Sequence, residues 1–78
     1  MLTLKCELTD TFGGEANYSW VRRETVSLPE SASRRSIVRA AKSALGINGI
    51  RCETIDYGDM VEIRPRGSCT VAFVTFAD

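Results

Sequence analysis

Polar and apolar residues alternate near the start of the chain, which is the pattern of a β-strand with one buried face. Over residues 2–9 the apolar positions are Leu2, Leu4, Cys6 and Leu8. Two adjacent glycines interrupt the alternation and predict a loop at 10–15. Alternation resumes over 17–28, where one parity holds Tyr18, Trp20, Val26 and Leu28. Pro29 ends this second strand because proline cannot donate to a ladder.

The middle of the chain, residues 31–45, has a helical period instead. At about 100° per residue, five apolar side chains fall within an arc of about 120°: Ile37, Val38, Ala41, Ala44 and Leu45. Ser31 or Ser33 fits the N-cap position, since a serine hydroxyl accepts from a free backbone N–H of the first turn. Gly46 fits the position just after the helix. A single amphipathic helix is therefore expected.

Three further strands are predicted in the last third of the chain. Residues 50–57 and 60–64 flank Gly58-Asp59, a pair typical of a tight hairpin turn. After a turn at 65–68, residues 69–76 are apolar on both parities, which predicts a central strand covered on both sides. The expected order is ββαβββ. The chain is thus predicted to be a single α+β domain, 1–78, with one helix packed on an antiparallel sheet of four to five strands.

All charges on the predicted helix have the same sign. The whole chain has ten basic and ten acidic residues, whereas 31–45 has no acid and four cations, Arg34, Arg35, Arg39 and Lys42. A helix that only covered a sheet would usually mix glutamates with its cations. Arg35, Arg39 and Lys42 share one flank, while Arg34 starts on the apolar side and is expected to extend outward. This flank is a candidate partner-binding surface; a solvated basic face is the alternative.

A second candidate contact lies in the first third of the chain. Trp20 precedes Arg22 and Arg23, and Phe12 stands in the predicted loop. Trp, Tyr and Arg dominate the hot spots of protein interfaces, and sites for single-stranded nucleic acid use them to stack bases and pair phosphates. The alternative is a core tryptophan next to two surface arginines.

The composition offers little for catalysis or metal binding. The chain has no histidine, the usual general base near neutral pH. Cys6, Cys52 and Cys69 have no CxxC spacing and are expected to be reduced thiols. A solvated turn explains the acids Asp56, Asp59 and Glu62 better than a cation site does. No catalytic residue, metal or cofactor is predicted, and the chain is not expected to be an enzyme.

Length and hydropathy bear on location and assembly. No apolar run approaches the roughly 18 residues of a membrane span, and the first residues lack the apolar stretch of a signal peptide. A cytoplasmic location without a membrane partner is therefore expected. A domain of 78 residues has a thin core, and homodimerisation is a common way to gain buried area. Cys69 follows a turn at a strand end and is the thiol expected to bridge two copies, because Cys6 and Cys52 have the parity of buried positions.

Four runs of residues resemble a known group of proteins: TDTFGGEANYSWVRR (9–23), RAAKSALGINGIRCE (39–53), YGDM (57–60) and RPRGSCTV (64–71). Together they resemble a small protein family carried by phages and mobile elements, and the chain is similar to small anti-CRISPR proteins that block type I effectors, type I-C in particular. The resemblance implies a stoichiometric inhibitor that binds the host surveillance complex (Cascade) and blocks recognition of target DNA. It implies no catalytic residues.

Two functions are open at this point. An inhibitor of the surveillance complex would use either the basic flank or an acidic patch formed by Asp10, Glu15, Asp56, Asp59 and Glu62. A small phage regulatory protein would instead bind nucleic acid directly through the basic helix. The sequence pI of about 6.2 argues against the second function, because dedicated nucleic-acid binders are usually basic overall.

Overall fold

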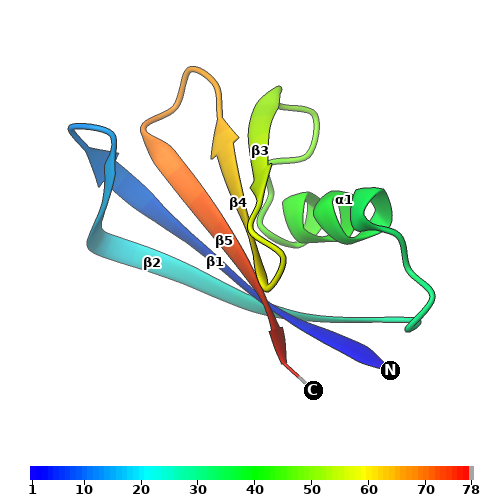
Figure 1. Cartoon of the computed structure of the whole chain (residues 1–78). Coiled ribbons are helices and arrows are strands. Elements are labelled where there is room, and N and C mark those ends of the chain that lie inside the picture. The colour runs from blue at the N-terminus through cyan, green and yellow to red at the C-terminus, as the bar shows by residue number, and fades with distance from the viewer. Residues whose placement is uncertain (78) are drawn as a thin grey trace.

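The computed structural model describes residues 1–77 and shows a five-stranded antiparallel sheet with one helix beside it (Figure 1). The strands are β1 (Leu2–Phe12), β2 (Glu15–Leu28), β3 (Cys52–Asp56), β4 (Met60–Pro65) and β5 (Thr70–Ala77), and the helix is α1 (Arg34–Ala44). Their order across the sheet is β2-β1-β5-β4-β3. The α+β class and the ββαβββ order predicted from the sequence are confirmed.

The hydrophobic core lies between α1 and one face of the sheet. The helical segment contributes Ile37, Ala41 and Leu45. The sheet contributes side chains of one alternating set, each less than a tenth exposed: Leu4, Cys6, Leu8, Val61, Ile63, Ala72 and Val74. The predicted helix stripe is thus confirmed at its centre, while Val38 and Ala44 are half-buried at the border of the core. We call the opposite side of the sheet the open face.

Both ends of α1 are capped as helix termini usually are. Ser33 is the N-cap, and its Oγ accepts a hydrogen bond from the Ser36 backbone N–H at 3.2 Å, which decides between the two predicted serines. Gly46 follows the C-cap and has a φ of 74°, in the left-handed region that glycine reaches without strain. The Ile47 N–H donates to the Lys42 carbonyl at 2.9 Å and satisfies one of the last carbonyls.

The segment 10–15, predicted to be a loop, is mostly strand. β1 extends to Phe12 and β2 begins at Glu15, so the turn is confined to the two glycines, both with positive φ. The irregularity instead interrupts the β1–β2 pairing between Thr9 and Thr11. There Thr9 Oγ1 accepts from the Tyr18 backbone N–H at 3.1 Å and donates to the Trp20 carbonyl at 2.9 Å. Side-chain hydrogen bonds thus replace ladder bonds, which alternation alone does not reveal.

Asp10 stabilises the outer side of this bulge. Its carboxylate accepts from Ser19 Oγ at 2.6 Å, from the Ser19 N–H at 3.0 Å and from Asn17 Nδ2 at 2.9 Å. Hydrogen bonds to a carboxylate favour its charged form. The bonds from Ser19 and then Asn17 therefore hold the pKa of Asp10 well below its usual value.

The central strand is β5, as predicted. The prediction that both of its faces are covered is wrong for most of its length. On the open face Val71 is fully buried, where Arg64 Nη1 donates to the Gly14 carbonyl of the β1–β2 turn at 2.8 Å. Phe73 follows on the same face and is only half-buried. The single helix formed by the described residues packs on the other side, so Phe73 has no second layer over it.

Ser33→Ala is expected to lower the free energy of unfolding by about 1 kcal/mol, because it removes the acceptor at the helix N-terminus. Ser31→Ala is the matched control, since Ser31 is exposed and precedes the helix; it should change stability by less than about 0.5 kcal/mol. Urea denaturation followed by circular dichroism measures both. An equal loss in the two variants would contradict the cap assignment.

Asp10→Asn is expected to be less stable than the wild type at neutral pH, and the difference should shrink in acid. A carboxyl whose folded pKa is lowered adds stability above its unfolded pKa, near 3.9, and this stability is lost as the pH falls toward the folded value. Thermal unfolding between neutral pH and about pH 2 measures the difference. A gap that stays constant across this range would show that the Asp10 charge does not stabilise the bulge.

Candidate binding site on the basic helix flank

One flank of α1 brings three cations to the rim of a shallow depression. Arg35, Arg39 and Lys42 lie at i, i+4 and i+7, so the helix presents them on the same side. Together with Val38, Asn48 and Gly49 they line a hollow of about 320 Å³. Val38 gives this hollow an apolar wall, and the turn after the helix closes its far side. The predicted grouping of the three cations is therefore observed.

The two arginines of this flank have no counter-ion among residues 1–77. In the part of the chain that the structure describes, no acidic side chain lies within ion-pair distance of Arg35 or Arg39, and both are exposed. Lys42 Nζ donates to the Ile50 carbonyl at 3.1 Å, which ties the following turn to the helix without neutralising the charge. The flank therefore presents unbalanced positive charge.

Arg34 is separated from this group. Its Nε lies 3.1 Å from Asp56 Oδ2, its Nη2 donates to the Gly58 carbonyl at 2.6 Å, and its guanidinium stacks 4.5 Å from the centre of the Phe76 ring. The side chain was expected to extend outward, but it turns toward β3, β5 and the β3–β4 turn instead. These contacts attach the start of α1 to the sheet.

The aromatic residues and arginines of β2 do not form a single contact surface. Arg22 lies on the helix side, where its Nη2 donates to the Ala44 carbonyl at 3.3 Å and its Nε pairs with Glu24. Arg23 points to the open face and pairs with Glu7 at 3.2 Å. Adjacent strand residues face opposite sides of a sheet, so this division follows from the pleat. Trp20 is 45% exposed, and Phe12, at 80%, projects from the end of β1.

The acidic residues are also dispersed. Glu62 is buried on the open face and pairs with Arg64, Asp56 pairs with Arg34, and Asp10 belongs to the bulge. Glu15 is exposed at the start of β2, and Asp59 is exposed in the β3–β4 turn. The described residues contain no group of three His, Cys, Asp or Glu side chains arranged to hold a metal ion.

The three thiols differ in access. Cys6 is buried in the core, and this burial raises the pKa of its thiol. Cys52, predicted to be buried, is half-buried, and its Sγ donates to the Ile50 carbonyl at 3.3 Å. Cys69 is exposed in the β4–β5 turn, as predicted. Access therefore ranks Cys69 first for bridging to a second copy.

Sequence reasoning missed the residues that complete the hollow, Val38, Asn48 and Gly49. Val38 was expected in the core stripe, whose edge it occupies. Asn48 and Gly49 belong to the turn after α1, where Gly49 has a φ of 88°. The Ile-Asn-Gly-Ile run signals a turn, but not that the turn folds back beside the cations.

Comparisons with known proteins add no assignment: the chain matches no family model, and no curated protein or solved structure is significantly similar to it. Among residues 1–77, no helix has the length and apolar character needed to cross a membrane.

A covalent dimer, where one forms under oxidising conditions, is expected to be linked through Cys69. Cys69→Ser should remove the dimer band from a non-reducing gel, whereas Cys52→Ser should leave it in place, since Cys52 is half-buried and bonded to a carbonyl. Persistence of the band in Cys69→Ser would contradict the assignment.

Proposed function

We propose that this protein is a stoichiometric, non-catalytic inhibitor that binds the surveillance complex of a type I CRISPR–Cas system and blocks its recognition of target DNA. The identity of the target rests on the sequence resemblance to small type I anti-CRISPR proteins. The mode of binding rests on one structural observation: Arg35 and Arg39 are exposed on a helix with no acidic partner among the described residues. The partner surface is accordingly expected to be acidic.

Arginines that have no carboxylate partner within the described residues are suited to this role. Arg22, Arg23, Arg34 and Arg64 each pair with a carboxylate of this chain, and a partner would have to displace that carboxylate first. Arg35 and Arg39 need no such exchange. Their guanidinium groups present a rigid donor fork that matches a carboxylate with two hydrogen bonds.

The surroundings of the flank favour a protein partner. Arg35 and Val38 line the 320 Å³ hollow and also a second groove of about 360 Å³ that runs between α1 and strands β3 and β4. An apolar side chain between two grooves, bordered by arginines, has the composition of an interface centre with a charged rim. A helix held at both ends by Ser33 and Arg22 presents these groups with little loss of conformational entropy.

Direct binding of nucleic acid is the second candidate. The cations stand at i, i+4 and i+7 along the helix, and this row would follow a phosphate backbone as well as an acidic protein surface. The two candidates differ in their response to salt, because release of counter-ions makes phosphate binding fall steeply as the salt concentration rises.

The triple variant Arg35→Glu, Arg39→Glu, Lys42→Glu is expected to weaken binding to a purified type I-C surveillance complex by at least about 100-fold, since hot-spot arginines each contribute more than about 1 kcal/mol. Biolayer interferometry with immobilised complex measures the affinity. Cleavage of target DNA in the presence of each protein reports inhibition. The fold should be unchanged, because the three side chains lie outside the core.

Arg51→Glu is the control, because Arg51 is an exposed cation that lines neither of the two grooves beside α1. It should bind and inhibit like the wild type. Unchanged inhibition by the triple variant would refute the role of the flank. Failure of the wild type to bind the complex, together with salt-sensitive binding of labelled DNA that the triple variant loses, would establish the second candidate instead.

A further inference from the structure

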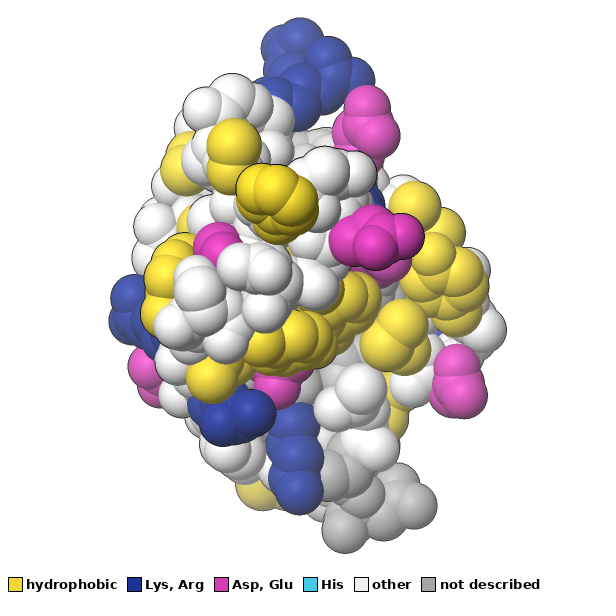
Figure 2. Space-filling view, turned by 90° about the vertical axis from the view of Figure 1, so that its left-hand side faces the viewer, with side chains coloured by type: hydrophobic (Ala, Val, Ile, Leu, Met, Phe, Trp, Pro, Cys, Tyr) yellow, Lys and Arg dark blue, Asp and Glu magenta, His cyan; other side chains and the backbone are white. Residues whose placement is uncertain are grey.

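The open face combines apolar side chains with charges that are already paired. Phe73 lies at its centre on β5, and Ile55 and Tyr57 project from the β3 side, 41% and 53% exposed. In the view from the side opposite the helix, hydrophobic side chains run across the middle of the molecule, with acidic side chains beside them and cations toward the upper and lower rims (Figure 2).

Two similar clusters flank Phe73. In the register of the sheet Phe73 stands opposite Glu7 on β1 and opposite Glu62 on β4. Glu7 pairs with Arg23 at 3.2 Å, and the Glu7 carboxylate raises the pKa of the Tyr18 hydroxyl. Glu62 pairs with Arg64 and accepts from the Tyr57 hydroxyl at 3.3 Å. Each cluster thus has one glutamate that pairs with one arginine and interacts with one tyrosine.

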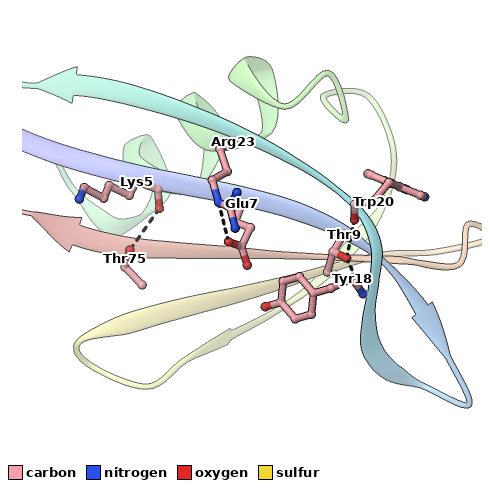
Figure 3. Close-up of polar contacts among 7 residues, drawn as sticks. All are labelled: Lys5, Glu7, Thr9, Tyr18, Trp20, Arg23 and Thr75. Atoms are coloured by element: carbon pink, nitrogen blue, oxygen red, sulfur yellow. Dashed lines mark hydrogen bonds and ion pairs between the residues drawn. The ribbon is translucent and has the colours of Figure 1, made fainter.

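Tyr18 reaches its cluster only through the β1–β2 bulge. Its φ of 57° is rare for a large side chain and costs of order 1–3 kcal/mol. Figure 3 shows its ring below the sheet, near Glu7, while Trp20 points to the other side. The bonds from Thr9 Oγ1 to the backbone on both sides of Ser19 maintain this conformation. Backbone strain that places an aromatic ring on an uncovered surface points to a use for that surface.

The charge of this face separates it from the helix flank. Arg23, Arg64 and Arg66 are each paired with a glutamate, Arg66 with Glu53 at 3.5 Å. These pairs leave little net charge to attract a polyanion. The combination of tyrosine, phenylalanine and arginine is instead that of a protein interface with an apolar centre.

The shape of the open face is complementary to that of a second copy of the same chain. Beside Phe73, on the β1–β2 half, lies a hollow of about 380 Å³ lined by Lys5, Glu7, Arg23, Thr25, Phe73 and Thr75. On the other half Ile55 and Tyr57 project outward. A two-fold axis near Phe73 brings the projecting half of each copy onto the hollow half of its partner, as a self-complementary interface requires. The outline of the domain, 36 by 22 Å, accommodates roughly the 800 Å² per partner of a standard interface.

We propose that two copies of this protein associate through their open faces, with Phe73 at the two-fold axis and Ile55 and Tyr57 of each copy seated in the hollow of the other. The dimer has two sheets packed face to face, which gives β5 the cover on both sides that its sequence predicts. The helices lie on the two outer surfaces, so both basic flanks stay accessible. This arrangement is independent of the proposed target.

Analytical ultracentrifugation in reducing buffer, over a concentration series up to the solubility limit, tests the proposal without any partner. The wild type should approach twice the chain mass of 8.6 kDa. Ile55→Lys and Phe73→Thr should each raise the dissociation constant of the dimer at least tenfold, in line with a loss of more than about 1 kcal/mol. Ile50→Lys is the matched control, because Ile50 is similarly exposed, at 38%, but lies in the turn beside α1, and it should dimerise like the wild type.

Circular dichroism and thermal unfolding establish whether each variant is folded. If Phe73→Thr unfolds, Ile55→Lys alone tests the dimer interface, because Ile55 is exposed on an edge strand and its substitution should not disturb the core. A wild type that stays monomeric overturns the proposal, as does a folded Ile55→Lys that dimerises normally. A monomeric wild type whose binding to the surveillance complex is lost in Ile55→Lys would assign the open face to that complex instead. The triple variant of the helix flank should still dimerise, whereas Ile55→Lys should not. This difference separates the test of the dimer from the test of the proposed function.

Discussion

The fold depends on the burial of one face of a five-stranded sheet under a helix of only 11 residues. The contacts that fix the helix are polar as well as apolar. Ser33 caps its start, Arg34 ties that start to the β3–β4 turn, and Arg22 donates to carbonyls at its end. The bonds of Ser33 and Arg22 satisfy backbone groups at the helix ends that would otherwise need water. The core stripe of Ile37, Ala41 and Leu45 can then be narrow because the helix orientation does not rely on packing alone.

The cations of the helix are consequently of two kinds, which composition cannot distinguish. All four cations raise the charge of the segment equally. Once the sheet is in place, Arg34 has a carboxylate, a carbonyl and an aromatic ring as partners. Arg35, the next residue, lines the same groove as Arg34 but has no acidic partner among residues 1–77. A rotation of about 100° per residue separates a structural arginine from one that is free to bind.

Sequence periodicity was sufficient for the elements but not for the contacts between distant segments. Alternation in β1, the apolar stripe of α1 and the glycine turns at 46 and 58 are local, so their elements follow from the residues themselves. The β1–β2 bulge depends on Thr9 and Asp10 meeting Tyr18 and Ser19 across a hairpin, and the anchor of Arg34 depends on a strand 22 residues away. Neither leaves a periodic signal, because hydrogen bonds of polar side chains depend on tertiary placement.

Among the predictions that the single chain does not satisfy, the cover expected on both faces of β5 is the most informative about the surface of the domain. Residues apolar on both parities are typical of a strand buried on both sides, and β5 meets this condition on the helix side and at Val71 but not at Phe73. A central strand does not need an aromatic residue there for folding alone, since a polar β-branched residue would suit a solvated face. The paired charges around Phe73 lower the cost of excluding water from it, because no unpaired glutamate has to be desolvated. The helix flank has the opposite arrangement, since its arginines have no acidic partner in the described part of the chain and attract an oppositely charged surface. The two sides of the domain therefore suit two different kinds of contact.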